Sequence, residues 1–542
     1  MEVSVVKSKK EIKLYLDGYS RVINETFCYI LGNIYNLDKL APSGITNEEK
    51  LIEAYKIYKN KLFKKLDGEF AIILIFNGNI TCVRDRMGSK QIYYMLKDDT
   101  TVISTSLGFF IKNYKEMLNI DRQVLSNYLC YSYIQAPNTI FKEVSKLEAG
   151  SFVQFKNSTV LIKKYYNLVN EYLKSKDKLH GKKSFAAMED SLKKAVLKRV
   201  KNKNKIGIFF SAGIDSTLLA SLSHELTDKE IHAYTIGFYD EERNEAVRAK
   251  KIAEYIGINY HEFYMDDTAA KEIIHQLPFI YSEPFADPSM IPTVFLNQNV
   301  DKVDVILTGD GADQLFCGSS VYDTVYERNI FALLQKEFLD IIQRRKKYKQ
   351  AKDSILKVYN GKKDMALKFV DIEPNSYYDL ALVPLKAQIK YMLFDIKTFL
   401  ANRLFSKVSF PAGYYNLNIT HPFVDNEFVD KTLKLSHKYK YNHKVKKYVL
   451  KKILYKRIPE ELLNQKKCGF GIPLKEWLYN IYREDIILLS NEEFIKKQNL
   501  FNFNKVNNII QKLNNNSLNH KEAYTLFAYY MFQLWYKAYI EN

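Results

Sequence analysis

The chain has 542 residues, of which 47% are hydrophobic and 26% are charged. This composition is typical of a globular protein with more than one hydrophobic core, and it excludes fibrous, collagen-like and largely disordered chains. The formal net charge is +19, but lysine recurs along the whole sequence rather than in one stripe, so we expect no nucleic-acid partner.

Signals for membrane insertion and for disulfide bonding are absent from the sequence. Apolar runs such as Ala71 to Phe76 are too short to cross a bilayer, and no apolar signal segment follows Met1. We therefore expect a cytoplasmic protein without a membrane partner. The five cysteines are scattered without a CxxC pair, which excludes a disulfide scaffold and argues against a cysteine zinc site.

Residues 1–167 are predicted to form a domain rich in β-strands. The run Phe70–Phe76 is apolar throughout, as in a buried strand, and the turn Asn77-Gly78-Asn79 leads into a pairing strand at Ile80–Val83. A second hairpin is expected from Ser151–Phe155 and Val160–Ile162.

The polar, lysine-rich stretch Leu168–Lys183 is predicted to be a linker to a second domain, residues 184–542. That domain begins with a helix from Ser184, the expected N-cap, to Val200. Strands and helices then alternate, which predicts the α/β fold class with a doubly wound parallel sheet. The expected strands are Ile206–Phe210, Ile231–Ile236 and Val303–Leu307, and the expected helices are Thr217–Leu226 and Glu245–Ile256.

Beyond Ser319 the pattern is mostly helical. The densest basic block, Lys444–Arg457, carries seven Lys or Arg in fourteen residues, with apolar residues interleaved at helical spacing. It predicts an amphipathic helix with a basic, solvated face. The interleaved residues are Val445, Val449, Leu450, Ile453 and Leu454.

The segment Gly207–Thr217 runs from an apolar strand through small residues into a helix. Such a turn exposes backbone N–H groups and a helix N-terminus, which together bind phosphate. Ser211 and Ser216 can donate hydroxyl hydrogens, and Asp215 stands where a Mg²⁺–phosphate complex would lie. The spacing matches neither a Walker A loop nor a Rossmann GxGxxG. An ordinary strand-to-helix turn is the alternative for this segment alone.

A second glycine-rich loop, Thr308–Gly318, also follows an apolar strand and carries Asp310 and Asp313. In a parallel sheet both loops leave the carboxyl ends of strands, where ligands bind in this architecture. Two acidic loops at one edge suit Mg²⁺ bound to a triphosphate. The alternative is that the aspartates serve turn formation and helix capping.

These segments together resemble the ATP-pyrophosphatase half of the asparagine synthetase family. The family's SGGxDS loop stands here as Ser211–Ser216, with Ala212 for one glycine, and its GDGxDELFxG loop as Gly309–Gly318, with Gln314 for glutamate. Further matches in family order are Ser282–Pro292, His421–Asp425 and Lys466–Trp477.

Residues 1–167 resemble the family's glutaminase-type, Ntn-hydrolase-like domain in a reduced form. The family's nucleophile is a cysteine directly after the initiator Met; here Glu2 occupies that place, and glutamate cannot act as an attacking thiolate. The segment before Gly32 is also too short for the family's glutamine-gripping loop. The resemblance therefore implies an inactive domain that supports the synthetase half. The matching segments are Gly32–Asn36, Leu66–Ala71, Arg84–Tyr94 and Pro137–Phe141.

The resemblance implies ATP and Mg²⁺ as cofactors, adenylation of a carboxylate with release of pyrophosphate, and attack of an amine on the acyl-adenylate. By resemblance, Asp215 and Asp313 would ligate Mg²⁺, whose charge stabilises the leaving pyrophosphate. The residues that would bind ATP are Ser211, Ala212, Gly213, Asp215, Ser216 and Gly309, with Ile236 and Gly237 at the adenine pocket.

Two further residues receive catalytic roles from the resemblance. Asp310 stands where the family has a residue facing the incoming amine, and a carboxylate there could orient or deprotonate an ammonium nucleophile. Lys467, two residues before Gly469, matches a family lysine that stabilises the transition states, although its neighbour Lys466 leaves the register open by one residue.

Loss of the cysteine favours family members whose substrate carries its own amine, such as β-lactam-type synthetases and lasso-peptide cyclases. We expect a cyclase of the lasso type, which implies a peptide carboxylate substrate, a precursor peptide and a partner protease. His421, where the family has arginine, and Ser409–Ala412 indicate that the acyl substrate is not plain aspartate.

Other functions stay open at this point. One is an asparagine synthetase that uses ammonia, and another is a non-catalytic nucleotide-binding pseudoenzyme. A tRNA-modifying ATP pyrophosphatase would suit the basic charge, but the Gly469–Pro473 block and the N-terminal domain argue against it. The sequence does not indicate the oligomeric state.

Overall fold

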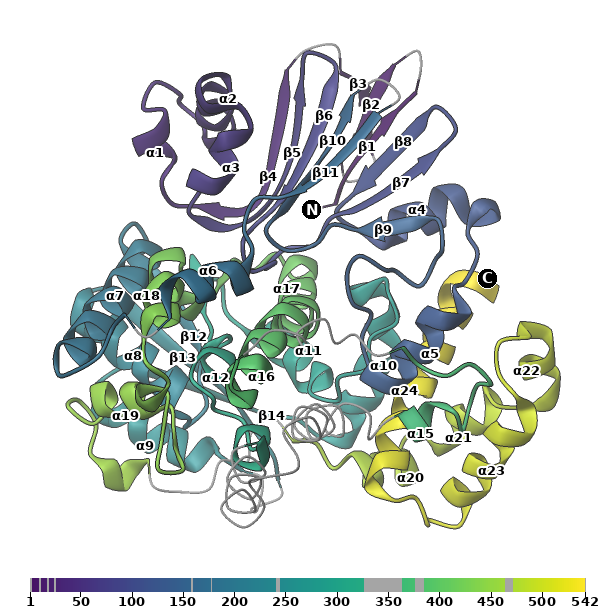
Figure 1. Cartoon of the computed structure of the whole chain (residues 1–542). Helices are drawn as coiled ribbons and strands as arrows, with labels where there is room; N and C mark the ends of the chain where they lie inside the picture. The colour runs from purple at the N-terminus through teal and green to yellow at the C-terminus, as the bar shows by residue number, and fades with distance from the viewer. Residues whose placement is uncertain are drawn as a thin grey trace, which may run out of the picture.

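The structure of the chain is a computed structural model. It describes residues 2–8, 11–16, 19–23, 26–156, 159–176, 178–239, 244–325, 363–375, 385–463 and 471–541. Two antiparallel sheets make up the N-terminal region, a parallel sheet covered by helices follows, and a helical group closes the chain (Figure 1). The mixed α/β fold class with a doubly wound parallel sheet, predicted from the sequence, is confirmed.

The N-terminal region is a sandwich of two antiparallel sheets, whose facing sides share one apolar core. The first sheet has the order β3 (Tyr19–Val22), β2 (Ile12–Leu16), β1 (Val3–Lys7), β8 (Thr100–Ser104), β7 (Tyr93–Lys97), β9 (Val144–Lys146). The second has the order β11 (Thr159–Lys164), β10 (Ser151–Lys156), β6 (Asn79–Arg84), β5 (Gly68–Phe76), β4 (Phe27–Ile34).

From Phe70 to Phe76, strand β5 is apolar because both of its faces are covered. Ile73 and Ile75 pack between the two sheets, whereas Ile72 and Leu74 pack against α2 (Asn47–Tyr58) and α3 (Leu62–Lys65). Successive side chains of a strand point to opposite faces, so a strand between two layers needs apolar residues at every position. Both predicted hairpins are confirmed, β5 with β6 and β10 with β11.

The stretch predicted to be a linker contains a helix, α6 (Leu168–Ser175). Asn167 caps it by accepting from the Asn170 N–H, and Tyr172 is buried. Leu168 and Val169 also pack against the core, so apolar contacts dock this mostly polar segment. The remaining helices before residue 168 are α1 (Leu37–Leu40), α4 (Leu107–Tyr114) and α5 (Arg122–Tyr131).

The second sheet system is parallel, with the order β14 (Asn259–Tyr264), β13 (Glu230–Gly237), β12 (Lys205–Phe209), β15 (Val305–Leu307), β16 (Ile419–Thr420). One face packs against α7 (Lys183–Val200), α8 (Ile214–Leu226) and α9 (Ala246–Ile256), and part of the other against α10 (Asp267–Tyr281) and α11 (Met290–Asn299). These strands and helices lie within a few residues of the predicted bounds.

Two local predictions in this part of the chain are wrong. Ser184 lies inside α7 and is not its N-cap, because the helix begins one residue earlier, and no side chain caps it. The basic block is helical only in α19 (Tyr448–Leu454), because Lys447 has a left-handed φ of 53°, and Val445 belongs to the short hairpin of β17 (Tyr441–Asn442) and β18 (Val445–Lys446).

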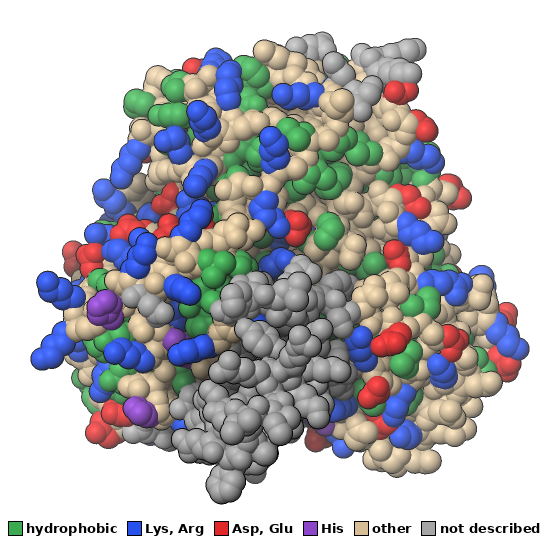
Figure 2. All heavy atoms as spheres, in the orientation of Figure 1, with side chains coloured by type: hydrophobic (Ala, Val, Ile, Leu, Met, Phe, Trp, Pro, Cys, Tyr) green, Lys and Arg blue, Asp and Glu red, His purple; other side chains and the backbone are tan. Residues whose placement is uncertain are grey.

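Part of the positive charge is neutralised within the fold. Arg457 and Lys456 of the basic block both contact Glu189, and Arg457 also contacts Glu225. On the face drawn in Figure 2, Lys and Arg side chains are spread over the surface and mixed with acidic ones, without one continuous basic stripe. Among the described helices, none is long and apolar enough to cross a membrane.

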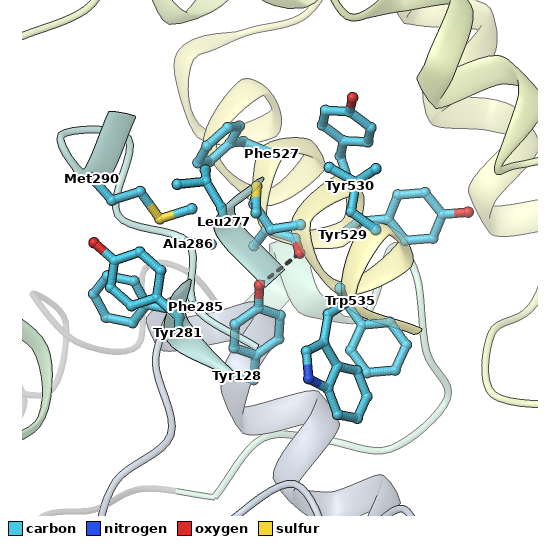
Figure 3. Close-up of a cluster of buried hydrophobic side chains, with 14 of the residues drawn as sticks. Tyr128, Leu277, Tyr281, Phe285, Ala286, Met290, Phe527, Tyr529, Tyr530 and Trp535 are labelled. Atoms are coloured by element: carbon cyan, nitrogen blue, oxygen red, sulfur yellow. Dashed lines mark hydrogen bonds between the residues drawn. The ribbon is translucent and has the colours of Figure 1, made fainter. Parts of the chain in front are cut away.

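The C-terminal helices form a core with α5, α10 and α11. Figure 3 shows Tyr128 of α5 pointing toward α24 (His520–Tyr536), where its hydroxyl donates to the Ala528 carbonyl at 2.9 Å. The Trp535 indole N–H donates to the Ser282 carbonyl at 3.0 Å. These bonds satisfy the polar atoms of large buried rings.

The other described helices of this part are α12 (Ala312–Leu315), α15 (Lys363–Ala366), α16 (Ala387–Asp395), α17 (Phe405–Tyr414), α18 (Asn426–Lys434), α20 (Leu474–Asn480), α21 (Arg483–Leu488), α22 (Glu492–Gln498) and α23 (Phe503–Asn514).

Glu522 at the start of α24 is expected to stabilise this core. Its buried carboxylate contacts Lys368 at 2.6 Å and Lys512 at 2.7 Å. Burial disfavours its charge, but these lysines and the Asn519 N–H lower the pKa of Glu522 to about 2. We expect Glu522→Gln to cost about 1–2 kcal/mol at pH 7.

Because the pKa of Glu522 is lowered on folding, its contribution is complete above about pH 4.5 and is lost as the pH falls toward 2. Thermal unfolding followed by circular dichroism at pH 7 and pH 3 measures both effects. Glu492→Gln, which removes an exposed pair with Lys496, is the control and should change the unfolding midpoint little. An equal loss in both variants would contradict the prediction.

Candidate active site

The order of the parallel sheet fixes where the candidate site lies. The chain runs outward from β12 through β13 to β14, and then returns to place β15 on the other side of β12. The loops after β12 and β15 therefore leave the sheet in opposite directions from adjacent strands, which opens a crevice at their carboxyl ends. Ser211–Ser216 follows β12, the Asp310 loop follows β15, and His421 follows β16.

The Ser211–Ser216 loop presents the N-terminus of α8 to this crevice. Gly213 is the N-cap, and no side chain caps the helix there. The Ser216 hydroxyl donates to the Ser211 carbonyl, and the Ser211 N–H donates back to the Ser216 Oγ at 3.1 Å. Ser216 thus shapes the loop, and the backbone N–H groups of the helix start are the donors offered to an anion.

Glycines bring the second loop against the first. A Cβ on Gly309 would come within 2.9 Å of the Asp215 Cβ, so only glycine permits this approach. Gly311 has a φ of +95°, and a Cβ there would lie 2.6 Å from Val424. The loop turns sharply at this point and continues into α12, which carries Asp313.

Lys447 joins the two loops, and its role was missed from the sequence. Its ammonium contacts Asp215 at 2.5 Å and also pairs with Asp313. Burial alone would lower the pKa of Lys447, but the two carboxylates outweigh it and hold that pKa above its usual range. The ammonium therefore stays charged, and it offsets the repulsion between the carboxylates.

A signal for Lys447 was present in the sequence. Leu450 and Leu454 lie three and seven residues after it, so a helix continued back to residue 447 would put Lys447 on the apolar side of the basic block, although α19 itself begins at Tyr448. A Cβ on Gly318 would collide with both Asp313 and Lys447, which explains the glycine at the end of the second loop.

Asp310 lies beside a fully buried histidine, and its own side chain is 19% exposed. The Thr308 hydroxyl donates to Asp310 Oδ2 at 2.8 Å and is 2.7 Å from His421 Nδ1. His421 Nδ1 lies 3.8 Å from the same carboxylate oxygen. Asp310 is thus held by its own loop and by the residue after β16, with its carboxylate on the crevice side of the sheet.

The remaining predicted site residues have different outcomes. Ile236 and Gly237 end β13, and a Cβ on Gly237 would lie 2.7 Å from the Tyr264 ring, so Gly237 is required for packing there. Ala212 is buried behind the first loop. Lys467 and its neighbour Lys466 lie outside the described residues.

The carboxylate pair fits a magnesium–nucleotide complex. Within the described ranges, no group of three or more His, Cys, Asp or Glu side chains could enclose a metal. Mg²⁺ in nucleotide sites is held by one or two carboxylates together with phosphate oxygens and water, so a closed cage is not needed. Asp215 and Asp313, which share one cation between adjacent loops, meet that requirement.

A cavity of about 520 Å³ lies where the N-terminal sandwich meets α10 and α17. Glu2, Gly32 and Lys90 line it from the sandwich, and Tyr414 and Asn418 line it from the other side. No cysteine is among the described residues that line it.

Comparison with known proteins identifies the family. The asparagine synthase family model matches residues 187–537, and the glutamine amidotransferase domain model matches residues 28–166. Asparagine synthetase (glutamine-hydrolyzing) 1 of Bacillus subtilis (strain 168) is 26% identical over 515 residues, covering 85% of this chain and 78% of the relative.

Two further relatives match shorter parts of the chain. Putative asparagine synthetase (glutamine-hydrolyzing) 2 of Methanocaldococcus jannaschii is 28% identical over 340 residues, which is 61% of this chain and 65% of the relative. Amidase chyE of Penicillium rubens is 25% identical over 317 residues, which is 53% of this chain and 46% of the relative. Because one family model spans more than half of the sequence, the chain belongs to the asparagine synthase family of ATP-dependent carbon–nitrogen ligases.

Proposed function

We propose that the chain adenylates a carboxylate with ATP and Mg²⁺, releases pyrophosphate, and joins the acyl group to an amine that its own substrate carries. The observation that carries this proposal is the convergence of Asp215, Asp313 and Lys447 where the two loops meet. A pseudoenzyme is disfavoured, because this constellation requires residues from three separate segments. We place the nucleotide site in residues 184–542 and assign 1–167 a supporting role.

The roles follow from position and charge. The N–H groups at the start of α8 and the Ser211–Ser216 loop would bind phosphate, with Gly309 allowing close approach. Asp215 and Asp313 would hold Mg²⁺, which neutralises charge on the leaving pyrophosphate. Lys447 keeps the two carboxylates together and supplies a fixed cation beside them. Ile236 and Gly237 would border the adenine.

Asp310 is proposed as the group that orients and deprotonates the ammonium nucleophile. It is hydrogen-bonded through one oxygen by Thr308, so that oxygen is fixed. General base catalysis needs a carboxylate held within hydrogen-bonding reach of the amine. Lys467 is proposed to stabilise the adenylation and amidation transition states.

Glutaminase activity is not expected, because Glu2 lines the interdomain cavity and cannot form a thioester with a glutamine acyl group. Within the family this favours a lasso-type peptide cyclase, working in the cytoplasm with a precursor peptide and a partner protease. The second candidate is an ammonia-dependent asparagine synthetase, favoured by the names of the relatives.

Pyrophosphate release from purified protein tests the proposed reaction. We expect none with ATP and Mg²⁺ alone, and release once a carboxylate substrate is added. Candidate peptides and aspartate plus ammonium are the two arms, and the arm that responds chooses between the two candidates. Asp215→Ala should abolish release. Nucleotide binding without release in either arm, for wild type and variant alike, would leave the pseudoenzyme as the better description.

Removing Lys447 tests whether its ammonium, which pairs with Asp215 and Asp313, supports nucleotide binding. Lys447→Met leaves Asp215 and Asp313 facing each other without a cation, and it removes a positive group from the phosphate side. We expect the affinity for Mg²⁺–ATP to fall roughly 10–100-fold, about 1.4–2.8 kcal/mol. Isothermal titration calorimetry measures this.

Lys446→Met is the matched control for this variant. Lys446 is the preceding residue, but it pairs with Asp323 instead of the loop carboxylates. Its removal should change the affinity less than twofold. If both variants lost affinity for Mg²⁺–ATP equally, the effect would come from the change in net charge and not from the contacts of Lys447 with the two aspartates.

The nitrogen source can be traced with glutamine labelled with ¹⁵N in its side-chain amide. We expect no conversion of glutamine to glutamate and no label in any product, because the cavity lined by Glu2 offers no thiol. Mass spectrometry of the reaction mixture measures both, with an active glutaminase as the positive control. Enzyme-dependent formation of glutamate would refute the assignment of an inactive glutaminase-type region.

A further inference from the structure

A buried chain of polar contacts runs from strand β5 of the sandwich to Asp310. Its first member is Glu69, whose carboxylate is 2% exposed and accepts from Arg199 Nη2 at 2.6 Å and from Thr420 Oγ1 at 2.6 Å. Both of its oxygens also accept from the backbone N–H of His421, at 3.1 and 3.0 Å. Glu69 therefore fixes the backbone where β16 ends.

His421 connects this carboxylate to the candidate site. Its backbone N–H donates to Glu69, and its ring Nδ1 lies 2.7 Å from the Thr308 hydroxyl. The other ring nitrogen, Nε2, lies 4.0 Å from Glu69 Oε2, which is too far for a hydrogen bond. A hydroxyl donates one hydrogen, and Thr308 gives that hydrogen to Asp310 at 2.8 Å. Thr308 must therefore accept from His421, so Nδ1 carries the hydrogen and points along the chain.

The charges around His421 come from every element that packs on it. Glu69 of β5 and Asp310 after β15 are negative, whereas Lys90 of the sandwich and Arg199 of α7 are positive. Burial lowers the pKa of His421, and these opposing charges do not reverse that. The ring is therefore neutral near pH 7, as the donation from Nδ1 alone requires.

We propose that Glu69 is a positioning residue for the ligase reaction, which acts through His421 and Thr308 to fix the Asp310 carboxylate. This inference rests on the proposed function, in which Asp310 receives the ammonium proton. It gives the glutaminase-type region a part in the chemistry of the other half: a carboxylate of that region sets the orientation of the general base from about three hydrogen bonds away.

A purely structural role for Glu69 is the competing explanation, because it forms an ion pair with Arg199 across the interface. The chain offers a matched control in Lys146 and Glu283, which form a second buried ion pair across the same interface at 2.6 Å. Among the described contacts, none links that pair to Asp310. Glu283→Gln therefore removes a buried ion pair at the same interface but leaves intact the hydrogen-bond chain from Glu69 to Asp310.

The first readout is the rate profile with whichever carboxylate substrate supports pyrophosphate release. We expect Glu69→Gln to lower kcat 10–100-fold and to leave KM for ATP within twofold, because Glu69 does not touch the nucleotide loops. The acid limb of kcat should move to higher pH, because the hydrogen bond from Thr308 favours the ionised carboxylate. Thr308→Val should move the same limb.

Glu283→Gln should leave the shape of the pH profile unchanged. If Glu69→Gln alone does not fold, the double variant Glu69→Gln/Arg199→Met removes both buried charges and serves in its place. Identical pH profiles for wild type and the Glu69 variants would overturn the proposal and leave the ion pair as structural.

The second readout does not need activity, so it separates this inference from the proposed function. In protein labelled with ¹⁵N-histidine, the His421 ring signals are assigned by their loss in His421→Asn. We expect a protonated Nδ1 whose signal shifts in Asp310→Asn and in Glu69→Gln, but not in Glu283→Gln. If the Nδ1 signal is unchanged in Glu69→Gln or in Asp310→Asn, the hydrogen-bond chain from Glu69 to Asp310 is absent, whatever reaction the protein catalyses.

Discussion

Negative charge gathered at one edge of the parallel sheet is the constraint on which the site depends. Asp215 and Asp313 come from loops after adjacent strands, and glycine at 309 lets those loops touch. Two carboxylates this close repel each other in a partly buried environment unless a cation lies between them. Lys447 is that cation, and its left-handed backbone places the ammonium there just before α19 begins.

The same principle governs the interface between the two halves. Arg199 of α7 is buried, and it contacts Glu69 of the sandwich, Asp425 after β16 and the face of the Tyr35 ring. Lys198 beside it pairs with Asp67 and Asp425. A buried ion pair stabilises little compared with apolar packing, but loss of one partner is costly. This network therefore ties the sandwich to the parallel sheet through several buried charges.

Local sequence patterns predicted much of this architecture. Contacts between residues far apart in the sequence could not be predicted in this way. The strands β5 and β12 were predictable because they are largely apolar runs. The loops after β12 and β15 were predictable because glycine and small polar residues follow directly after an apolar strand. Lys447 was not, since its partner Asp215 lies 232 positions away and its lysine neighbours made a solvated face the obvious expectation. Glu69 and Arg199 are 130 positions apart, so no local pattern pairs them. The helix at Leu168–Ser175 was not predicted, because the stretch is mostly polar and only Tyr172, Leu168 and Val169 pack on the core.

Retention of these buried charges bears on the role of the glutaminase-type region. A region kept only as a scaffold could hold its neighbour with apolar contacts, because replacing a buried ion pair by well-packed apolar residues is often neutral or stabilising. Here Glu69 instead accepts from the backbone N–H of His421, whose ring lies one hydroxyl away from Asp310. The part of the sandwich that faces the ligase site therefore makes several defined hydrogen bonds to it. Glu2 at the cavity, in contrast, has no thiol that could act as the nucleophile of a glutaminase. This combination fits the proposed ligase, whose amine comes from its own substrate instead of from glutamine.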